Sequence, residues 1–323
     1  MNSSPSKDID IVIVDGYTLN PGDLSWDGLY ELGNIQYHDR TPVALIAERC
    51  KNATVIVTNK APVSADVIND AKNLRLIAVT ATGYNVVDTE AAKKRGISVC
   101  NVPVYGTDSV AQHTFALLLE LSNRVGLHAE SVSKEEWSKA ADWCYTLSPI
   151  IEISGKILGI VGYGRIGQQV AKVGQAFGMQ VLYHNRSPKQ GPGKQVGMEE
   201  LFSKSDFVSL HCPVTKENTG FINASLLSLM KPTAFLINTS RGQLINEIEL
   251  AEVLKNRGIA GAALDVLSVE PPPANHPLIG VPGCLITPHV AWISFEARQR
   301  LMKVTRENIA NFLKGSPQNV VNK

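Results

Sequence analysis

Short apolar runs alternate with longer amphipathic stretches along the first hundred residues of the chain. The runs are rich in Ile and Val, which favours strands, and the stretches between them carry apolar residues at helical spacing. Strands that alternate with helices in this way are typical of a parallel α/β sheet. We expect strands at 9–15, 53–57, 74–81 and 97–100, and helices at 43–50, 64–72 and 88–95.

The same rhythm restarts in the second half of the chain. A helix capped by Thr107 or Asp108 should run through the apolar residues 115–121 and lead from one domain to the next. Helical stretches then separate the later strands, and the pattern fits two βαβαβ halves. We expect these strands at 158–161, 180–184, 206–211, 234–238, 260–264 and 285–287.

Two further segments change this picture only at its edges. The amphipathic run at 294–314 needs an apolar partner surface, and an end helix that folds back on the first domain would supply one. The stretch at 190–197 contains three glycines and a proline, and we expect it to be a surface loop.

Length and charge limit the class of protein. The 323 residues suggest two domains, and 31 Lys and Arg against 30 Asp and Glu give a net charge of +1. So small a charge provides no overall field toward nucleic acid or an anionic membrane. The start of the chain is polar, and no stretch approaches roughly 18 uninterrupted apolar residues. We therefore expect a cytoplasmic protein without a nucleic-acid or membrane partner.

The five cysteines are odd in number and scattered without a C-x-x-C pair. This spacing argues against both a disulfide framework and a cysteine zinc site. We expect buried free thiols and no bound metal.

A G-x-G-x-x-G motif lies directly after an apolar strand and before a helix. It consists of Gly162, Gly164 and Gly167, with Arg165 and Ile166 between the last two glycines. The first glycine would allow a tight turn, the second a close approach of the backbone to a pyrophosphate, and the third close packing of helix on sheet. The alternative is a glycine-rich turn without a ligand, which the strand–turn–helix context disfavours.

The position that selects the cofactor is not acidic in this chain. NAD-selective sites carry Asp or Glu at the end of the next strand, whereas Asn185 stands here, followed by Arg186 and Ser187. A cation and a hydroxyl can hold a 2′-phosphate through charge-assisted hydrogen bonds. We expect NADP(H) to be preferred and NAD(H) to be possible. In the alternative, Arg186 stacks on adenine or points to solvent while NADH binds.

Three polar residues stand just after late strands, where an open α/β sheet places its ligand crevice. They are Arg241, Glu270 and His289. Taken singly, each has a structural explanation as an ion pair, a loop residue or a strand-end histidine. The occurrence of all three in this order along the chain favours a catalytic role over these structural explanations.

These segments together resemble the D-isomer-specific 2-hydroxyacid dehydrogenase family. The matching pieces are 162–167, 238–242, 265–272 and 288–292, and the likeness runs from residue 9 to the last helix. The resemblance implies two doubly wound parallel-sheet domains. A Rossmann dinucleotide-binding domain at 104–289 would be inserted into a flavodoxin-like substrate domain at 1–103 and 290–323. It also implies hydride transfer from NAD(P)H to a small 2-keto acid, which gives the D-2-hydroxy acid.

The chemistry of that reduction fits the three residues. Arg241 can clamp the substrate carboxylate in a bidentate fork. His289 is suited to be the general acid, because an imidazole gains and loses a proton near neutral pH. Glu270 would bond to the other ring nitrogen and orient the imidazole. In formate dehydrogenases of this superfamily the matching position carries Gln, which favours a hydroxy acid over formate.

Further site residues follow from the resemblance alone. The loop at 80–88 is similar to the family loop whose backbone amides hold the substrate carboxylate, with Thr82 and Gly83 as the nearest matches. Apart from the resemblance, the aromatic Trp292 beside His289 is expected to close the substrate pocket, and the alternative is plain packing at a helix start. On the cofactor side the resemblance adds Val110, Cys212, Pro213, Thr239 and Asp265.

Softer features are similar to the glycerate dehydrogenase or hydroxypyruvate/glyoxylate reductase branch, namely 142–145, Gln112 and 291–292. Hydroxypyruvate or glyoxylate is therefore the leading substrate. Two alternatives stay open: a D-lactate-like dehydrogenase that uses NADH, and a cofactor-sensing, corepressor-like binding protein. The resemblance also implies a homodimer, with the helix at 111–122 and the segment up to residue 150 as the dimerising arm.

Overall fold

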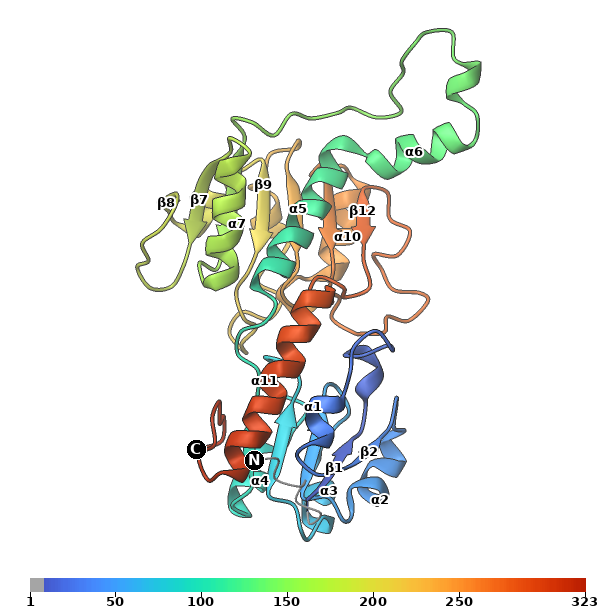
Figure 1. Ribbon diagram of the computed structural model, residues 1–323. Coiled ribbons are helices and arrows are strands. Elements are labelled where there is room, and N and C mark those ends of the chain that lie inside the picture. Colours follow the sequence, from blue (N-terminus) through green and yellow to red (C-terminus); the bar gives the residue numbers. More distant parts are fainter. Residues whose placement is uncertain (1–8) are drawn as a thin grey trace. The chain divides into compact units, whose positions relative to one another are not determined.

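The computed structural model describes residues 9–323, which form two compact units. One unit ends at Tyr105 and resumes at Ile293, and the other spans Gly106–Trp292. The limits expected from the sequence are 103/104 and 289/290. Each unit is a parallel sheet with helices on its faces (Figure 1). The expected α/β class, with two doubly wound sheets, is thereby confirmed.

The first unit has a five-stranded sheet with the order β2-β1-β3-β4-β5, all pairs parallel. This is the flavodoxin-like order. The three central strands bury almost every residue, as expected when helices cover both faces of a parallel sheet. The strands are β1 (Asp10–Ile13), β2 (Asn34–Tyr37), β3 (Val55–Thr58), β4 (Leu76–Val79) and β5 (Ser98–Cys100).

Among its described residues this unit has five α-helices. Ser64 and Asp88 cap α3 and α4, because their side chains accept from the backbone N–H three residues further on. The final helix packs on β4, so the end of the chain rejoins the first unit, as its amphipathic pattern predicts. The helices are α1 (Asp27–Tyr30), α2 (Ile46–Cys50), α3 (Ala65–Asp70), α4 (Thr89–Lys94) and α11 (Phe295–Leu313).

The second unit has a seven-stranded parallel sheet with the order β12-β11-β10-β9-β6-β7-β8. Its first strand, β6, lies in the interior, and the strand order reverses between β6 and β9. That switch point is where doubly wound sheets bind ligands. The strands are β6 (Ile157–Val161), β7 (Gln180–His184), β8 (Lys194–Gln195), β9 (Phe207–Leu210), β10 (Phe235–Asn238), β11 (Gly261–Leu264) and β12 (Cys284–Ile286).

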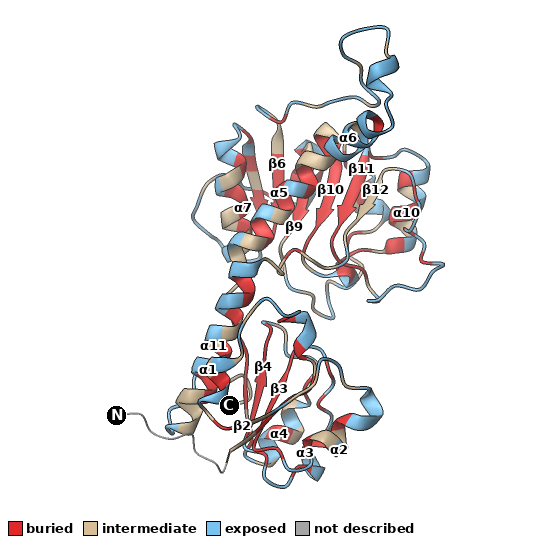
Figure 2. Cartoon of the chain, turned by 45° about the vertical axis from the view of Figure 1, so that its right-hand side comes forward, coloured by how far each residue is buried: buried red, intermediate tan, exposed pale blue. Residues whose placement is uncertain are grey.

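Helices cover both faces of this sheet, and their outer sides are exposed whereas the central strands β6, β9, β10 and β11 are buried (Figure 2). The helix that opens the unit, α5, packs against α7 and against β10 and β11. The helices are α5 (Thr107–Asn123), α6 (Val125–Ser133), α7 (Arg165–Ala176), α8 (Met198–Lys204), α9 (Ala224–Leu227) and α10 (Glu247–Lys255).

Several local expectations are wrong. The stretch at 190–197 contains β8, a two-residue edge strand whose exposed Lys and Gln give no apolar signal. The edge strand β2 was not expected either, because its NIQY sequence is half polar. Helix α5 is capped by Gly106 rather than by Thr107 or Asp108. All five cysteines are free, but only Cys50 and Cys100 are buried, whereas Cys212 and Cys284 are half-buried and Cys144 is exposed.

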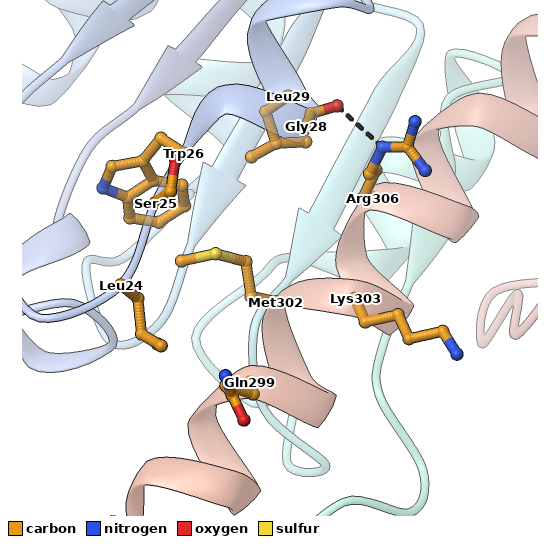
Figure 3. A pocket seen from close by; sticks show the side chains of 9 residues that line it. All are labelled: Leu24, Ser25, Trp26, Gly28, Leu29, Gln299, Met302, Lys303 and Arg306. Atoms are coloured by element: carbon orange, nitrogen blue, oxygen red, sulfur yellow. Dashed lines mark hydrogen bonds between the residues drawn. The ribbon is translucent and has the colours of Figure 1, made fainter.

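A cavity of about 300 Å³ lies in the first unit between the α1 segment and α11. Arg306 crosses one side of it and donates from Nε to the carbonyl of Gly28 at 2.8 Å (Figure 3). The lining contains none of the residues that the sequence marks for catalysis or cofactor binding. It consists of Leu24, Ser25, Trp26, Gly28, Leu29, Gln299, Met302, Lys303 and Arg306.

Two kinds of feature are absent from residues 9–323. No helix in that range is long and apolar enough to cross a membrane. The same residues contain no group of three or more His, Cys, Asp or Glu side chains placed to hold a metal ion.

Candidate active site

The glycine-rich turn after β6 has two glycines that close packing requires. Gly162 has a φ of +96°, and a Cβ there would overlap the backbone at the end of β9. A Cβ at Gly167 would overlap the carbonyl oxygen of Gly162. Gly164 is different, because no atom of the described residues outside its own stretch of chain lies within 4 Å of the position its Cβ would take. The backbone at Gly164 is therefore open to a ligand.

Helix α7 begins at Arg165, directly beside this open backbone. Its cap residue, Gly164, provides no side-chain acceptor for the first N–H groups of the helix. Uncapped N–H groups and the positive end of the helix dipole bind phosphate groups well. Beneath the turn, the Tyr163 ring stacks on Tyr183 with centroids 3.8 Å apart. The turn thus fits the pyrophosphate of a dinucleotide.

Asn185, at the end of β7, ties the glycine turn to the loop that follows it. Its Oδ1 accepts from Tyr163 N at 3.0 Å, and its Nδ2 donates to the carbonyl and hydroxyl oxygens of Ser187 at 2.9 and 3.2 Å. A carboxylate could accept the first bond but could not donate the other two. The amide at this position therefore has a structural reason, whichever cofactor binds.

Arg186 is exposed, and its positive charge acts on Cys212 at the end of β9. Burial raises the pKa of the Cys212 thiol, and the positive charge of Arg186 opposes that shift. Pro213, next to Cys212, is exposed. Arg186, Cys212 and Pro213 therefore lie at the edge of the sheet where the strands end, which is also the edge of the glycine turn.

His211 also lies at this strand end, and the sequence alone did not mark it. Burial lowers the pKa of this imidazole to about 3, so that it is neutral. Its Nε2 lies 2.8 Å from the Ser209 hydroxyl, and its buried Nδ1 has no hydrogen-bond partner within the described part of the chain. His211 thus leaves one buried polar atom beside the glycine turn for which the described residues supply no partner.

His289 and Glu270 come together at the ends of β12 and β11. The distance from His289 Nδ1 to Glu270 Oε2 is 2.6 Å, and the side chains are 28% and 36% exposed. The other carboxylate oxygen of Glu270 accepts from Leu267 N at 3.0 Å. Because Nδ1–H donates to the carboxylate, Nε2 is the ring nitrogen that a ligand can meet.

Arg241 follows β10, the strand next to β11. The Asn238 side chain closes this turn by accepting from Ser240 N and donating to the Arg241 carbonyl, both at 2.9 Å. The Arg241 side chain is exposed, and one Nη1 hydrogen bond of 2.7 Å goes to the Ser240 carbonyl. A guanidinium has five donors, so most of this fork remains for an anion. Within the same turn Thr239 is buried, with its hydroxyl 3.1 Å from that of Thr114.

Asp265 anchors the turn that carries His289. The histidine has a φ of +55°, a left-handed conformation that is costly for a residue with a side chain. Its backbone N–H donates to the Asp265 carbonyl at 2.8 Å. The Asp265 carboxylate accepts from Val290 N and Ala291 N, both at 2.9 Å. Asp265 thereby stabilises the strained backbone that places the imidazole.

The Asp265 carboxylate has two further partners that the sequence did not indicate. The Thr287 hydroxyl donates to it at 2.6 Å, and His113 Nε2 on α5 lies 3.3 Å away. Burial by itself would raise the pKa of Asp265, but the hydrogen bonds from His113, Thr287 and the backbone outweigh it and hold that pKa below its ordinary value. Val110, the residue of α5 that the resemblance placed on the cofactor side, is buried.

In the first unit, Thr82 and Gly83 follow β4 in a loop held by two asparagines. Asn59 Nδ2 donates to the Thr80 carbonyl, and Asn101 Nδ2 donates to the Thr82 carbonyl, both at 2.7 Å. The Thr82 hydroxyl donates to the carbonyl of the residue after Asn101 at 2.8 Å. Trp292, the last residue of the second unit, is half-buried.

A doubly wound sheet with an open glycine turn, together with a histidine–glutamate pair and an arginine at neighbouring strand ends, defines a dinucleotide-dependent oxidoreductase. The model for the family described as D-isomer specific 2-hydroxyacid dehydrogenase, NAD binding domain, matches residues 115–291.

The chain is also similar to known proteins over most of its length. It is 45% identical to a hydroxypyruvate reductase of Blautia hydrogenotrophica over 97% of this chain and 99% of that protein. It is 41% identical to a glycerate dehydrogenase of Methylorubrum extorquens over 85% of this chain and 88% of that protein. A crystal structure of an NADPH-dependent glyoxylate/hydroxypyruvate reductase from Sinorhizobium meliloti, in complex with citrate, matches with a TM-score of 0.84 and 27% identity over 97% of both chains. The chain therefore belongs to the D-isomer specific 2-hydroxyacid dehydrogenase family.

Proposed function

We propose that this protein reduces hydroxypyruvate or glyoxylate to D-glycerate or glycolate, with NADPH as the preferred cofactor. The observation that carries the proposal is the 2.6 Å hydrogen bond between His289 and Glu270, beside the turn of Arg241. The names of the relatives favour this activity over a D-lactate-like dehydrogenase and over a corepressor-like binding protein.

Each of the three residues has a distinct task. Arg241 binds the substrate carboxylate through the donors of its fork that the protein does not use. His289 donates a proton from Nε2 to the carbonyl oxygen as negative charge develops there, and takes a proton back in the reverse direction. Glu270 keeps the imidazole oriented and stabilises its positive charge. The bound nicotinamide cofactor supplies the hydride that this proton complements.

Substrate binding involves further groups. Thr82 and Gly83 provide backbone amides for the carboxylate, in a loop whose carbonyls Asn59 and Asn101 hold. Trp292 limits the size of the substrate side chain, which favours a small keto acid.

The cofactor site extends from the glycine turn to the end of β7. The backbone at Gly164 and the start of α7 hold the pyrophosphate. The exposed Arg186 and Ser187 hold a 2′-phosphate, and the charge-assisted bond of the guanidinium is the source of the NADPH preference. The remaining contacts are assigned to Val110, Gly162, Arg165, Ile166, Gly167, Asn185, Cys212, Pro213, Thr239 and Asp265.

Steady-state kinetics on glyoxylate, hydroxypyruvate, pyruvate and phenylpyruvate, each with NADPH and NADH, test the proposal. We expect the highest kcat/KM for hydroxypyruvate or glyoxylate with NADPH. Preference for pyruvate with NADH would identify a D-lactate-like enzyme instead. Cofactor binding without turnover of any keto acid would identify a binding protein.

The homodimer remains a prediction, and the segment after α5 supports it. This segment exposes apolar side chains, including 61% of Val125, 53% of Trp137 and 85% of Trp143. Exposed apolar residues that cluster in one segment are typical of a surface that a partner covers. A monomer in sedimentation analysis at micromolar concentration would contradict this prediction.

A further inference from the structure

The turn that carries Arg241 and the turn that carries Glu270 are joined at one residue, Ser268. A Cβ at Gly242 would overlap the peptide bond that precedes Ser268, so the two turns meet backbone to backbone. The amide of Gln243 donates to the Ser268 carbonyl at 2.8 Å. Gly242 and Gln243, the two residues that follow Arg241, therefore both contact Ser268.

Glu247, the first residue of α10, binds Ser268 as well. Its Oε1 accepts from Ser268 N at 2.7 Å, and its Oε2 accepts from the Ser268 hydroxyl. His276 Nε2 lies 3.2 Å from the same Oε2, and the His276 and Glu247 side chains are only 4% and 9% exposed. A carboxylate buried in this way needs its hydrogen-bond partners, because an unpaired charge in the interior is costly. The geometry around Ser268 is therefore fixed.

Ser268 in turn sets the position of Glu270, which lies two residues further on. Glu270 accepts from Leu267 N, on the other side of Ser268, and holds His289. A displacement of Ser268 therefore moves the carboxylate that orients the imidazole.

We propose that Glu247 is a positioning residue, which acts through Ser268 to hold the Glu270–His289 pair in a fixed relation to the turn of Arg241. This inference rests on the proposed function of those three residues. Glu247 is buried and acts without touching the substrate. Its effect is to keep the imidazole in the tautomer that carries a proton on Nδ1, with Nε2 directed to a ligand.

Two variants of the full-length protein test the proposal. Glu247→Gln keeps the size of the side chain but replaces one acceptor oxygen with a donor, and Ser268→Ala removes only the hydroxyl. We expect kcat to fall about tenfold in each variant, the usual scale for groups that orient a functional side chain. KM for the keto acid should change by less than about threefold. The ¹⁵N resonances of His289, assigned with His289→Gln, should change from one tautomer to a mixture.

Glu249→Gln is the matched control. Glu249 lies on the same helix, and its Oε2 accepts from Ala224 N at 2.5 Å, away from Ser268. We expect this variant to lower the melting temperature but to leave the His289 tautomer and kcat unchanged. An unchanged tautomer in both test variants, or an equal change in the control, would overturn the proposal. The resonance is measured without substrate, so a lack of turnover would count against the proposed function alone.

Discussion

The two units share a doubly wound architecture but differ at the turn after their first strand. In the second unit this turn leaves the backbone at Gly164 open beside the start of α7. In the first unit the turn after β1 carries Asp15, whose carboxylate accepts from the backbone N–H groups of residues 59–61 in the turn after β3. The Tyr37 ring occupies the space that a Cβ at Gly16 would need.

This difference shows that a shared fold does not imply a shared function. A doubly wound sheet provides the same switch point in both units, but only the second leaves its backbone donors for a phosphate. In the first unit the protein's own carboxylate and an aromatic ring take the place of a ligand. The strand ends differ in the same sense. Arg241, Glu270 and His289 follow β10, β11 and β12 of the second unit, whereas the neutral side chains of Asn59 and Asn101 hold the loop after β4 in the first.

A substitution of His289, which follows β12 in the second unit, should have the largest effect on activity. We predict that His289→Gln lowers kcat for hydroxypyruvate about a thousandfold, since the general acid is lost. The Kd for NADPH, measured by fluorescence quenching, should remain within about twofold, because the glycine turn is intact. A variant that keeps a tenth of the activity would contradict the role of His289.

A pair of glycine variants tests the comparison of the two turns. Gly164→Val places a side chain in open space at an ordinary φ, so the melting temperature should hold while NADPH binding weakens about a hundredfold. Gly16→Ala should do the reverse, with a loss of about 1–3 kcal/mol of stability from overlap with Tyr37 and unchanged NADPH affinity. Calorimetric titration and thermal melts measure both. Equal effects of the two variants on cofactor binding would refute the distinction.

Arg186→Ala tests the cofactor preference. We predict that kcat/KM for NADPH falls about tenfold, the value of one charge-assisted hydrogen bond to phosphate, while kcat/KM for NADH stays the same. An equal fall with both cofactors would mean that the guanidinium contacts the adenine rather than a 2′-phosphate.

Two aspartates, one in each unit, should give the smallest effects, and their pH dependence should have opposite sign. Hydrogen bonds outweigh burial and lower the pKa of Asp265, whereas burial outweighs the hydrogen bonds and raises the pKa of Asp15. Asp265 therefore contributes stability that is present above the unfolded pKa of about 3.9 and is lost as the pH falls through the folded pKa. The stability that Asp15 contributes to the folded protein falls as the pH rises from about 3.9 through the raised folded pKa of this residue.

Melting temperatures of Asp265→Asn and Asp15→Asn at pH 3 and pH 7 measure this difference. The penalty of Asp265→Asn, about 1–3 kcal/mol at pH 7, should shrink at pH 3. The penalty of Asp15→Asn should instead be larger at pH 3 than at pH 7. If both penalties changed in the same direction with pH, the contrast between the two carboxylates would be wrong.

Buried strands and local motifs could be predicted from the sequence, because their signal lies in neighbouring residues. The apolar runs of β3 and β6 are clear, whereas the edge strands β2 and β8 are polar and were not found. Gly162, Gly164 and Gly167 could be predicted for the same reason, since their spacing is local.

Contacts between distant segments could not be predicted. The partners of Asp265 come from α5 and from the segment after β12, and Glu247 meets Ser268 across a whole helix and strand. Nothing in the local pattern around Glu247 distinguishes it from other acidic residues at a helix start. Such residues usually stabilise a helix through a favourable interaction with its dipole. Only the folded chain brings such residues next to the turns of Arg241 and Glu270.

Isotope transfer tests the proposed reaction most directly. NADPH deuterated at the transferable position of the nicotinamide would be incubated with the protein and hydroxypyruvate, and the product analysed by mass spectrometry and chiral chromatography. We predict D-glycerate with deuterium on C2, formed far more slowly by His289→Gln. Product without deuterium, L-glycerate, or no product from the folded protein with bound NADPH would contradict the proposed function.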